Sequence, residues 1–163
     1  MQPFFRLISG RIERATQDSA AFDLFSSAEE TIFVGDAPVL IPTNVRSEFS
    51  PGFVAIMKER SGLGLKGLEL KAGVIDADYR GVWGVVARYP LRRLHKLNPA
   101  TNKFEHWEDP DWQPFAIHPG DKIAQFLLIE TAKLEMINGG GEMNFGCAVR
   151  GEKGFGSSDR KQS

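Results

Sequence analysis

The chain has 163 residues, with 20 basic and 21 acidic side chains, a net charge of −1, and 42% hydrophobic residues. This length suits one domain with a real core, and the balanced charge argues against a nucleic acid or a membrane surface as the main partner. The single cysteine, Cys147, cannot form an internal disulfide. Neither a signal peptide nor a run of roughly 20 apolar residues is present. We therefore expect an intracellular, cytoplasmic protein.

Short apolar runs separated by glycine, proline and small polar residues predict many short strands. The runs cover residues 31–34, 39–41, 53–57, 82–87, 123–129 and 133–137. Such spacing favours an all-β antiparallel sandwich or barrel, including jelly-roll forms. One short helix is expected over residues 61–68, where three glycines weaken the helical tendency.

Two segments in the first half of the chain carry charged residues suited to anions or cations. Asp23 interrupts an apolar strand-like run, so its carboxylate needs a hydrogen-bond network or a hydrated cation. Arg60, Ser61 and Gly62 precede the expected helix, an arrangement that suits an anion.

The segment Gly73-Val74-Ile75-Asp76-Ala77-Asp78-Tyr79-Arg80-Gly81 carries the strongest functional signal. Two acids, an aromatic and a basic residue lie between glycines, with apolar runs on both sides. The pattern predicts a β-hairpin that holds charged groups at its tip, where loops of a rigid scaffold carry chemistry. A solvated acidic turn would be the simpler interpretation if the segment stood alone.

Further along, Gly120-Asp121-Lys122-Ile123-Ala124-Gln125 reads as a tight turn followed by a strand. Gln125 would point to one face of that strand; the simpler interpretation is a polar residue on an edge strand. From Gly139 onward the chain is rich in glycine, serine and charge, and we expect a mobile arm over residues 139–163. Within this arm, several residues are of the types that bind phosphate: Arg150, Lys153, Gly154, Gly156, Ser157 and Ser158. Phe155 lies between two of these glycines, where its ring could stack on a flat ligand.

In order, these five segments resemble the motifs of the trimeric dUTPase family, the deoxyuridine triphosphate nucleotidohydrolases. The motifs span residues 21–158, nearly the whole chain. The resemblance implies a distorted, β-clip-like jelly roll over residues 1–138, a homotrimer with active sites shared between subunits, and a mobile C-terminal arm. It also implies Mg²⁺-assisted attack of water on the α-phosphorus of dUTP, giving dUMP and pyrophosphate.

The resemblance assigns a role to each matching residue. Asp76 would activate the attacking water, Asp23 would hold hydrated Mg²⁺, and Tyr79 would pack under the deoxyribose. The backbone of Gly73, Val74, Ile75 and Asp78 would read uracil. The phosphates would be bound by Arg60, Ser61, Gly62, Gln125, Arg150 and Gly156–Ser158, while Phe155 would cover the base. Two departures from the family pattern are Glu59, where proline is usual, and Asp159, where glycine is usual.

The largest departure is an insertion over residues 88–115. Folding it as a hairpin around residues 98–103 pairs Leu97 with Phe104, Lys96 with Glu105, His95 with His106, Leu94 with Trp107, Arg93 with Glu108 and Arg92 with Asp109. Opposite charges and apolar residues then face one another, as in a self-supporting arm. The arm is either a surface hairpin or extra trimer packing, or it is a docking surface for another protein. It also leans toward a phage as the source, in which case the enzyme would act in the host cytoplasm.

Two other functions remain open. A dCTP deaminase has a related fold, but the intact segment from Ile75 to Tyr79 argues against it. A regulatory binding protein on the dUTPase scaffold is also conceivable, although none of the motif residues is missing. Nucleic-acid binding as the main function is disfavoured by the charge balance.

Overall fold

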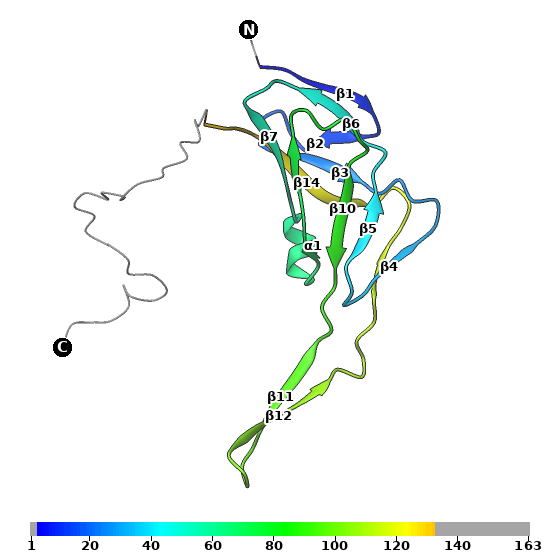
Figure 1. Cartoon of the computed structure of the whole chain (residues 1–163). Helices are drawn as coiled ribbons and strands as arrows, with labels where there is room; N and C mark the ends of the chain where they lie inside the picture. The colour runs from blue at the N-terminus through cyan, green and yellow to red at the C-terminus, as the bar shows by residue number, and fades with distance from the viewer. Residues whose placement is uncertain (1–2, 133–163) are drawn as a thin grey trace, which may run out of the picture. The chain divides into compact units, whose positions relative to one another are not determined.

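The computed structural model describes residues 3–132, and the fold is almost entirely β with one short helix (Figure 1). The elements in chain order are β1 Phe5–Ser9, β2 Ile12–Arg14, β3 Phe22–Phe25, β4 Ile32–Val34, β5 Val39–Pro42, β6 Arg46–Phe49, β7 Phe53–Lys58, α1 Ser61–Leu65, β8 Glu69–Leu70, β9 Val74–Asp76, β10 Gly84–Arg88, β11 Arg93–Asn98, β12 Lys103–Glu108, β13 Phe115–Ile117 and β14 Lys122–Glu130. Five of the six expected apolar runs are strands, with ends shifted by a few residues. The sixth, at 133–137, lies outside the described residues, as does the expected arm over 139–163.

The strands form one five-stranded sheet and several smaller ones. The larger sheet has the order β2-β3-β14-β7-β9, with every neighbouring pair antiparallel. The smaller sheets are β5-β10-β8, β1-β6, β13-β4 and the separate hairpin β11-β12. Strands distant in sequence are thus neighbours, which is the expected consequence of jelly-roll connections and not of successive hairpins.

The core lies between these sheets and is built on aromatic rings. Phe126, on β14, is fully buried, and its ring centroid lies 5.0 Å from that of Trp83 and 5.6 Å from that of Phe5. Aliphatic residues from β5, β10 and β14 complete the cluster, including Ile41, Val85 and Ile123. The alternation of buried and partly buried residues along β10 explains why its sequence predicts a strand with one face in the core.

The prediction of a β-hairpin around residues 73–81 is wrong. The two flanking strands do not pair with each other: β9 pairs with β7, through Ile75 opposite Ala55, while β10 pairs with β5 and β8. The segment is a connection between two sheets. Sequence alternation identified the strands, but it contains no information on which distant strand each one joins.

Two smaller expectations also need correction. The helix ends at Leu65, three residues earlier than expected, and Gly67 then adopts a φ of +94°. Gln125 is not on an edge, because β14 lies between β3 and β7. The local residue types are compatible with both observations, but they determine neither where the helix ends nor which strands lie beside β14.

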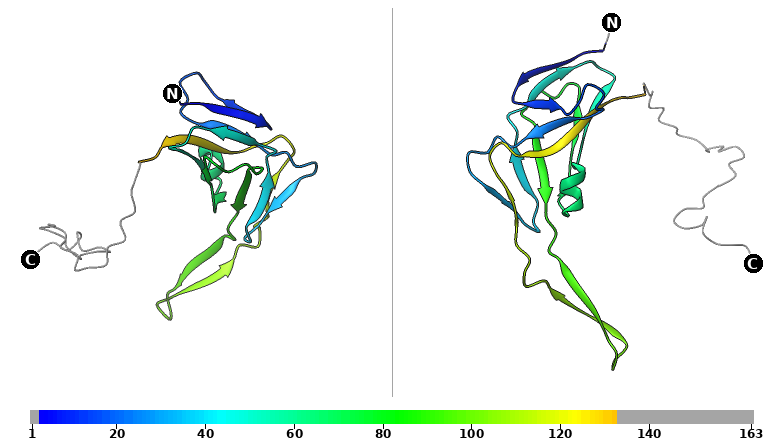
Figure 2. Two further views of the ribbon diagram at one scale, coloured as in Figure 1. Left: turned by 45° about the horizontal axis from the view of Figure 1, so that its top comes forward. Right: turned by 180° about the vertical axis from the view of Figure 1, so that it is seen from behind.

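The inserted arm has the register expected from sequence. Each pair from Arg93–Glu108 to Asn98–Lys103 lies opposite as predicted, including His95 with His106. Beyond the end of the ladder, Arg92 also meets Asp109, through a backbone hydrogen bond of 2.9 Å and an ion pair of 3.6 Å. The hairpin projects away from the other sheets (Figures 1 and 2), and every residue of β12 is exposed.

A ring cluster fixes the base of the arm. Tyr89 stacks on Trp112 at 5.9 Å, and the Trp112 indole nitrogen donates to the Pro90 carbonyl at 3.1 Å. The Tyr89 amide also donates to Gly35, at 2.7 Å. We define the arm as β11 and β12, and the body as the remaining elements.

Candidate functional site

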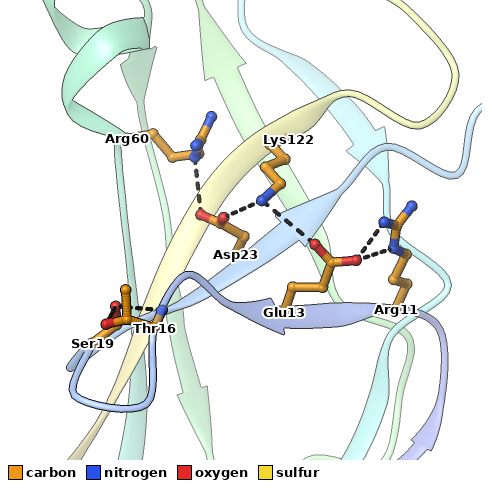
Figure 3. A network of polar contacts seen from close by, with 7 residues as sticks. All are labelled: Arg11, Glu13, Thr16, Ser19, Asp23, Arg60 and Lys122. Carbon is orange, nitrogen blue, oxygen red and sulfur yellow. Dashed lines mark hydrogen bonds and ion pairs between the residues drawn. The ribbon is translucent and has the colours of Figure 1, made fainter.

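The predicted acid Asp23 lies at the centre of an ionic network. Its carboxylate, on β3, accepts from Arg60 Nε at 2.9 Å through Oδ1 and from Lys122 Nζ at 2.8 Å through Oδ2 (Figure 3). Asp23 is only 8% exposed, so two cationic partners are what its burial requires. The first of the two alternatives for Asp23, a hydrogen-bond network, is therefore what the described residues show.

The network extends to the edge of the five-stranded sheet. Lys122 Nζ also lies 3.5 Å from Glu13 Oε2, and Arg11 Nε donates to Glu13 Oε1 at 2.9 Å. The hydrogen bond from Arg11 lowers the pKa of Glu13, and the hydrogen bond to Asp23 raises the pKa of Lys122. We call the five residues Arg11, Glu13, Asp23, Arg60 and Lys122 the Asp23 network. Its charges alternate and sum to +1, which favours an anionic ligand over a free cation.

Gln125 and Glu59 fasten the start of the helix to the sheet. The Gln125 side-chain amide donates to the Glu59 carbonyl at 2.9 Å, and the Glu59 carboxylate accepts from the Leu70 amide at 3.0 Å. That second bond lowers the pKa of Glu59. The Glu59 carboxylate thus binds a backbone amide, which the proline expected at this position from the family resemblance could not do.

Arg60 precedes α1 with extended backbone, and its carbonyl accepts from both Leu63 and Gly64 at 2.9 Å. Ser61 and Gly62 are exposed in the first turn. Because the helix has only five residues, its dipole contributes little, and the cationic side chains carry the attraction for an anion.

Asp76 and Tyr79 line a cavity of about 430 Å³, to which β9 contributes together with β5 and the start of β10. The remaining lining residues are Leu40, Pro42, Val74, Ile75, Val82, Trp83 and Gly84. The walls are thus mainly apolar, with one carboxylate and one phenol. A flat, partly apolar ligand that presents a reacting group to the acid fits this composition.

The Asp76 carboxylate is exposed at the end of β9. It makes no side-chain hydrogen bond or ion pair with the side chains that the structure describes, those of residues 3–92 and 97–132, in contrast to Asp23. The neighbouring Tyr79 amide donates to the Asp76 carbonyl at 3.1 Å, which closes a turn directly after the acid. A carboxylate held by its backbone alone is available to a ligand or a water molecule.

At two positions of this segment, 73 and 81, a side chain larger than that of glycine would clash with its neighbours. Gly73 has a φ of +149°, and a Cβ added there would lie 2.7 Å from Met57 Cβ. A Cβ on Gly81 would lie 2.3 Å from the Tyr79 hydroxyl oxygen, so the phenol ring packs directly over the glycine backbone. Gly73 allows β9 to approach β7, and Gly81 allows Tyr79 to take its position.

The structure brings the predicted residues together in two groups. The first joins Asp23, Arg60 and Gln125, and the second joins Asp76 and Tyr79 with Val74 and Ile75; no residue of the first group lines the cavity. Asp78 is exposed in the turn. The sequence did not identify Arg11, Glu13 and Lys122 as members of the network. The position of Glu13 between two arginines, Arg11 and Arg14, is a signal that could have indicated an ionic cluster. The predicted tail residues Arg150, Phe155, Gly156, Ser157 and Ser158 lie outside the described residues.

Neither a metal cluster nor a membrane helix is found where the structure can be described. Among the residues whose side chains the structure describes, 3–92 and 97–132, no group of three or more His, Cys, Asp or Glu side chains converges on one point. In the same range, no helix is long and apolar enough to cross a membrane.

Comparisons with known proteins agree with this fold and these motifs. A family model described as dUTPase matches residues 10–88, so the match ends at the start of the insertion over residues 88–115. The deoxyuridine 5′-triphosphate nucleotidohydrolase of Oryza sativa subsp. japonica is 35% identical over 151 residues, which cover 89% of this chain and 71% of the relative.

Solved structures extend the likeness to three dimensions. A variant of the Staphylococcus bacteriophage 80alpha dUTPase, solved with dUpNHpp, has a TM-score of 0.73 and 27% identity, covering 96% of this chain and 98% of that chain. A dUTPase variant from phage phi11 of S. aureus, whose structure describes a structural Mg(II) ion, has a TM-score of 0.61 and 24% identity, covering 85% of this chain and 98% of that chain. The motifs, the jelly-roll fold and these relatives lead to one conclusion: this chain belongs to the dUTPase family.

Proposed function

We propose that this chain hydrolyses dUTP to dUMP and pyrophosphate. The observation that carries the proposal is the cavity of about 430 Å³ in which Asp76 and Tyr79 lie together on mainly apolar walls. Membership of an enzyme family whose relatives are nucleotidohydrolases supports it. The product dUMP would serve as a precursor of dTTP, and removal of dUTP would keep uracil out of DNA.

Asp76 is the residue we assign to the attacking water. An aspartate carboxylate is a weak general base. It therefore acts mainly by accepting a hydrogen bond from one water and holding that water in line with the α-phosphorus. No cationic partner of Asp76 is present among the side chains of residues 3–92 and 97–132, and this supports the assignment, because a paired carboxylate would be a poorer acceptor.

Base and sugar selection would come from the segment between Gly73 and Tyr79. The Tyr79 ring is fixed by Gly81 below it and by a hydrogen bond from its hydroxyl to the Val82 carbonyl at 3.2 Å. A ring held in this way leaves little space for a 2′-hydroxyl group on the sugar. The backbone of Gly73, Val74, Ile75 and Asp78 would supply hydrogen bonds to uracil, with no room for a 5-methyl group.

The triphosphate would be bound by the other group of residues. Arg60 and Gln125 provide donors, and Ser61 and Gly62 expose a hydroxyl and a backbone amide beside them. We assign the α-phosphate to Gln125. Arg150, Gly156, Ser157 and Ser158 would add contacts from the C-terminal segment, with Phe155 over the base.

The residues present fit Mg²⁺ only through water. Both Asp23 oxygens accept from a cation, yet a carboxylate offers about four acceptor positions, so two remain for the water ligands of a metal ion. Mg²⁺ prefers to keep several waters and to bind substrate phosphates directly. When bound, it would neutralise charge on the phosphate oxygens. Asp23, oriented by Arg60 and Lys122, would hold it in place.

We further propose a homotrimer in which each active site combines residues of different subunits. The separation of the Asp23 network from the cavity at Asp76 supports this, since no residue contributes to both. We place the enzyme in the cytoplasm, or in the host cytoplasm if a phage encodes it. The arm would be an additional surface for a protein partner.

The products and the isotope position test the proposed reaction. Hydrolysis of dUTP in ¹⁸O-labelled water should yield dUMP and pyrophosphate in equal amounts, with the label in dUMP, as attack at the α-phosphorus requires. Label in pyrophosphate, or release of dUDP and orthophosphate, would contradict the proposal. Mass spectrometry of the separated products distinguishes these outcomes.

A further inference from the structure

The loop between β9 and β10 begins directly after Asp76, the residue assigned to the water, and contains Tyr79, the residue assigned to the sugar, yet it receives little support from the sheets. Its backbone leaves the β7–β9 ladder at Asp76 and is next fixed at Trp83, whose amide donates to the Val45 carbonyl at 2.8 Å. We call residues 77–82 the Asp76 loop. Loops that carry chemistry need a rigid support, because small displacements of the reacting groups are costly.

Within the loop, one guanidinium organises the backbone. Arg80 Nη1 donates to the Ala77 carbonyl at 2.7 Å and to the Tyr79 carbonyl at 3.2 Å. Together with the turn bond from the Tyr79 amide to Asp76, these contacts fix the shape of the loop. They do not fix the position of the loop on the molecule, since all of them are local.

A second guanidinium supplies that position. Arg46 donates to the Arg80 carbonyl through both Nε, at 3.1 Å, and an Nη2 group, at 2.9 Å. Among the described residues, no other side chain from outside the Asp76 loop hydrogen-bonds to it. Arg46 opens β6 directly after the fully buried Val45, the same residue that receives the Trp83 amide. The start of β6 thus holds both the loop and its exit.

We propose that Arg46, which belongs to none of the five motifs, is a positioning residue that determines substrate discrimination by holding the Asp76 loop against the cavity. The forked contact to a single carbonyl restrains direction as well as distance. Without it, the loop keeps its shape but shifts as a unit, and Tyr79 moves relative to the sugar. This inference rests on the proposed function for its kinetic consequence, but not for its structural one.

The test compares Arg46→Met, Arg46→Lys and a matched control, Arg6→Met. Methionine keeps an aliphatic stem without donors, and lysine restores the charge and one donor. Arg6 is an exposed arginine on β1, the strand paired with β6, and its partner at 3.0 Å is the side chain of Glu48. It therefore controls for the general loss of a surface arginine on this sheet.

Steady-state kinetics is the first measurement. For Arg46→Met we expect KM for dUTP to rise and the ratio of kcat/KM for dUTP over UTP to fall about tenfold, since misplacement by about 1 Å costs up to 10²-fold. Arg46→Lys should restore part of that ratio, and Arg6→Met should keep it. A ratio for Arg46→Met equal to that of the wild type would overturn the proposal.

Hydrogen exchange of the folded variants is the second measurement, and it does not depend on enzyme activity. Amides of residues 77–82, above all that of Tyr79, should exchange faster in Arg46→Met than in the wild type or Arg6→Met. Unchanged exchange would overturn the proposal even if kinetics changed. If the wild type does not hydrolyse dUTP but exchange is faster in Arg46→Met, the positioning of the loop by Arg46 is supported and the proposed function is contradicted.

Discussion

The body and the arm of this molecule differ in what determines their strand pairing. In the arm, β11 and β12 are adjacent in sequence, and their register follows from cross-strand charge and apolar complementarity, with every residue of β12 exposed. In the body, β9 joins β7 and β10 joins β5 and β8, and burial of Val85, Ala87 and Phe126 selects these partners. Function is assigned to the region whose pairing is long-range.

The comparison explains which predictions succeeded. A hairpin register is a local property, so the arm could be predicted to the residue. The strands of the body could be predicted from alternation, but their neighbours could not, because the choice depends on tertiary packing. The hairpin expected at residues 73–81 failed for this reason.

The same distinction applies to the site. The motif residues could be identified from sequence, whereas the partners of Asp23 could not. Lys122 lies 99 positions away in the chain and reaches the carboxylate only because β14 pairs with β3. Arg46 was missed too, since nothing near it in sequence marks the loop it supports.

The largest effect is expected from Asp76→Asn. The amide keeps the shape of the carboxylate but is uncharged and presents an NH2 donor in place of one acceptor oxygen, so it should orient the water poorly and turnover should fall by roughly 10²- to 10⁴-fold. Binding of dUpNHpp, measured by calorimetry, should stay close to that of the wild type. Turnover near the wild-type value would remove the role assigned to Asp76.

A purely structural change in the body should also be severe. Gly73→Ala places a Cβ 2.7 Å from Met57 Cβ at a φ of +149°, and we expect a loss of about 2 to 4 kcal/mol in the free energy of unfolding. Gly52→Ala is the matched control, because Gly52 has a φ of +86° with open space around it. It should cost about 1 kcal/mol. Equal losses in urea denaturation would show that the close approach of β9 to β7 is unimportant.

The Asp23 network should contribute less than the packing at Gly73. Asp23→Asn removes the negative charge between two cations at a buried position, and we expect a loss of about 1 to 3 kcal/mol in the free energy of unfolding. Glu48→Gln, which disrupts the exposed pair with Arg6, should cost less than about 1 kcal/mol. If thermal melts show the reverse order, the network is not what holds β3 and β14 together.

The smallest effect on the body is expected from removal of the arm. Replacing Leu91–Asp111 by Asn-Gly keeps the stack of Tyr89 on Trp112 at the base, and turnover of dUTP should stay within about twofold because the arm is remote from the cavity. Loss of the trimer in light scattering would instead assign the arm to subunit packing. Unchanged copurifying proteins would count against its role as a docking surface.

The measurement that tests the central claim most directly is pyrophosphate release by the purified protein with Mg²⁺, comparing dUTP with dTTP, dCTP and UTP. Release from dUTP alone is the predicted result, and it would support both the water-activating role of Asp76 and the exclusion of the 5-methyl and 2′-hydroxyl groups by the segment between Gly73 and Tyr79. No release from dUTP, or release of ammonia from dCTP, would contradict the account.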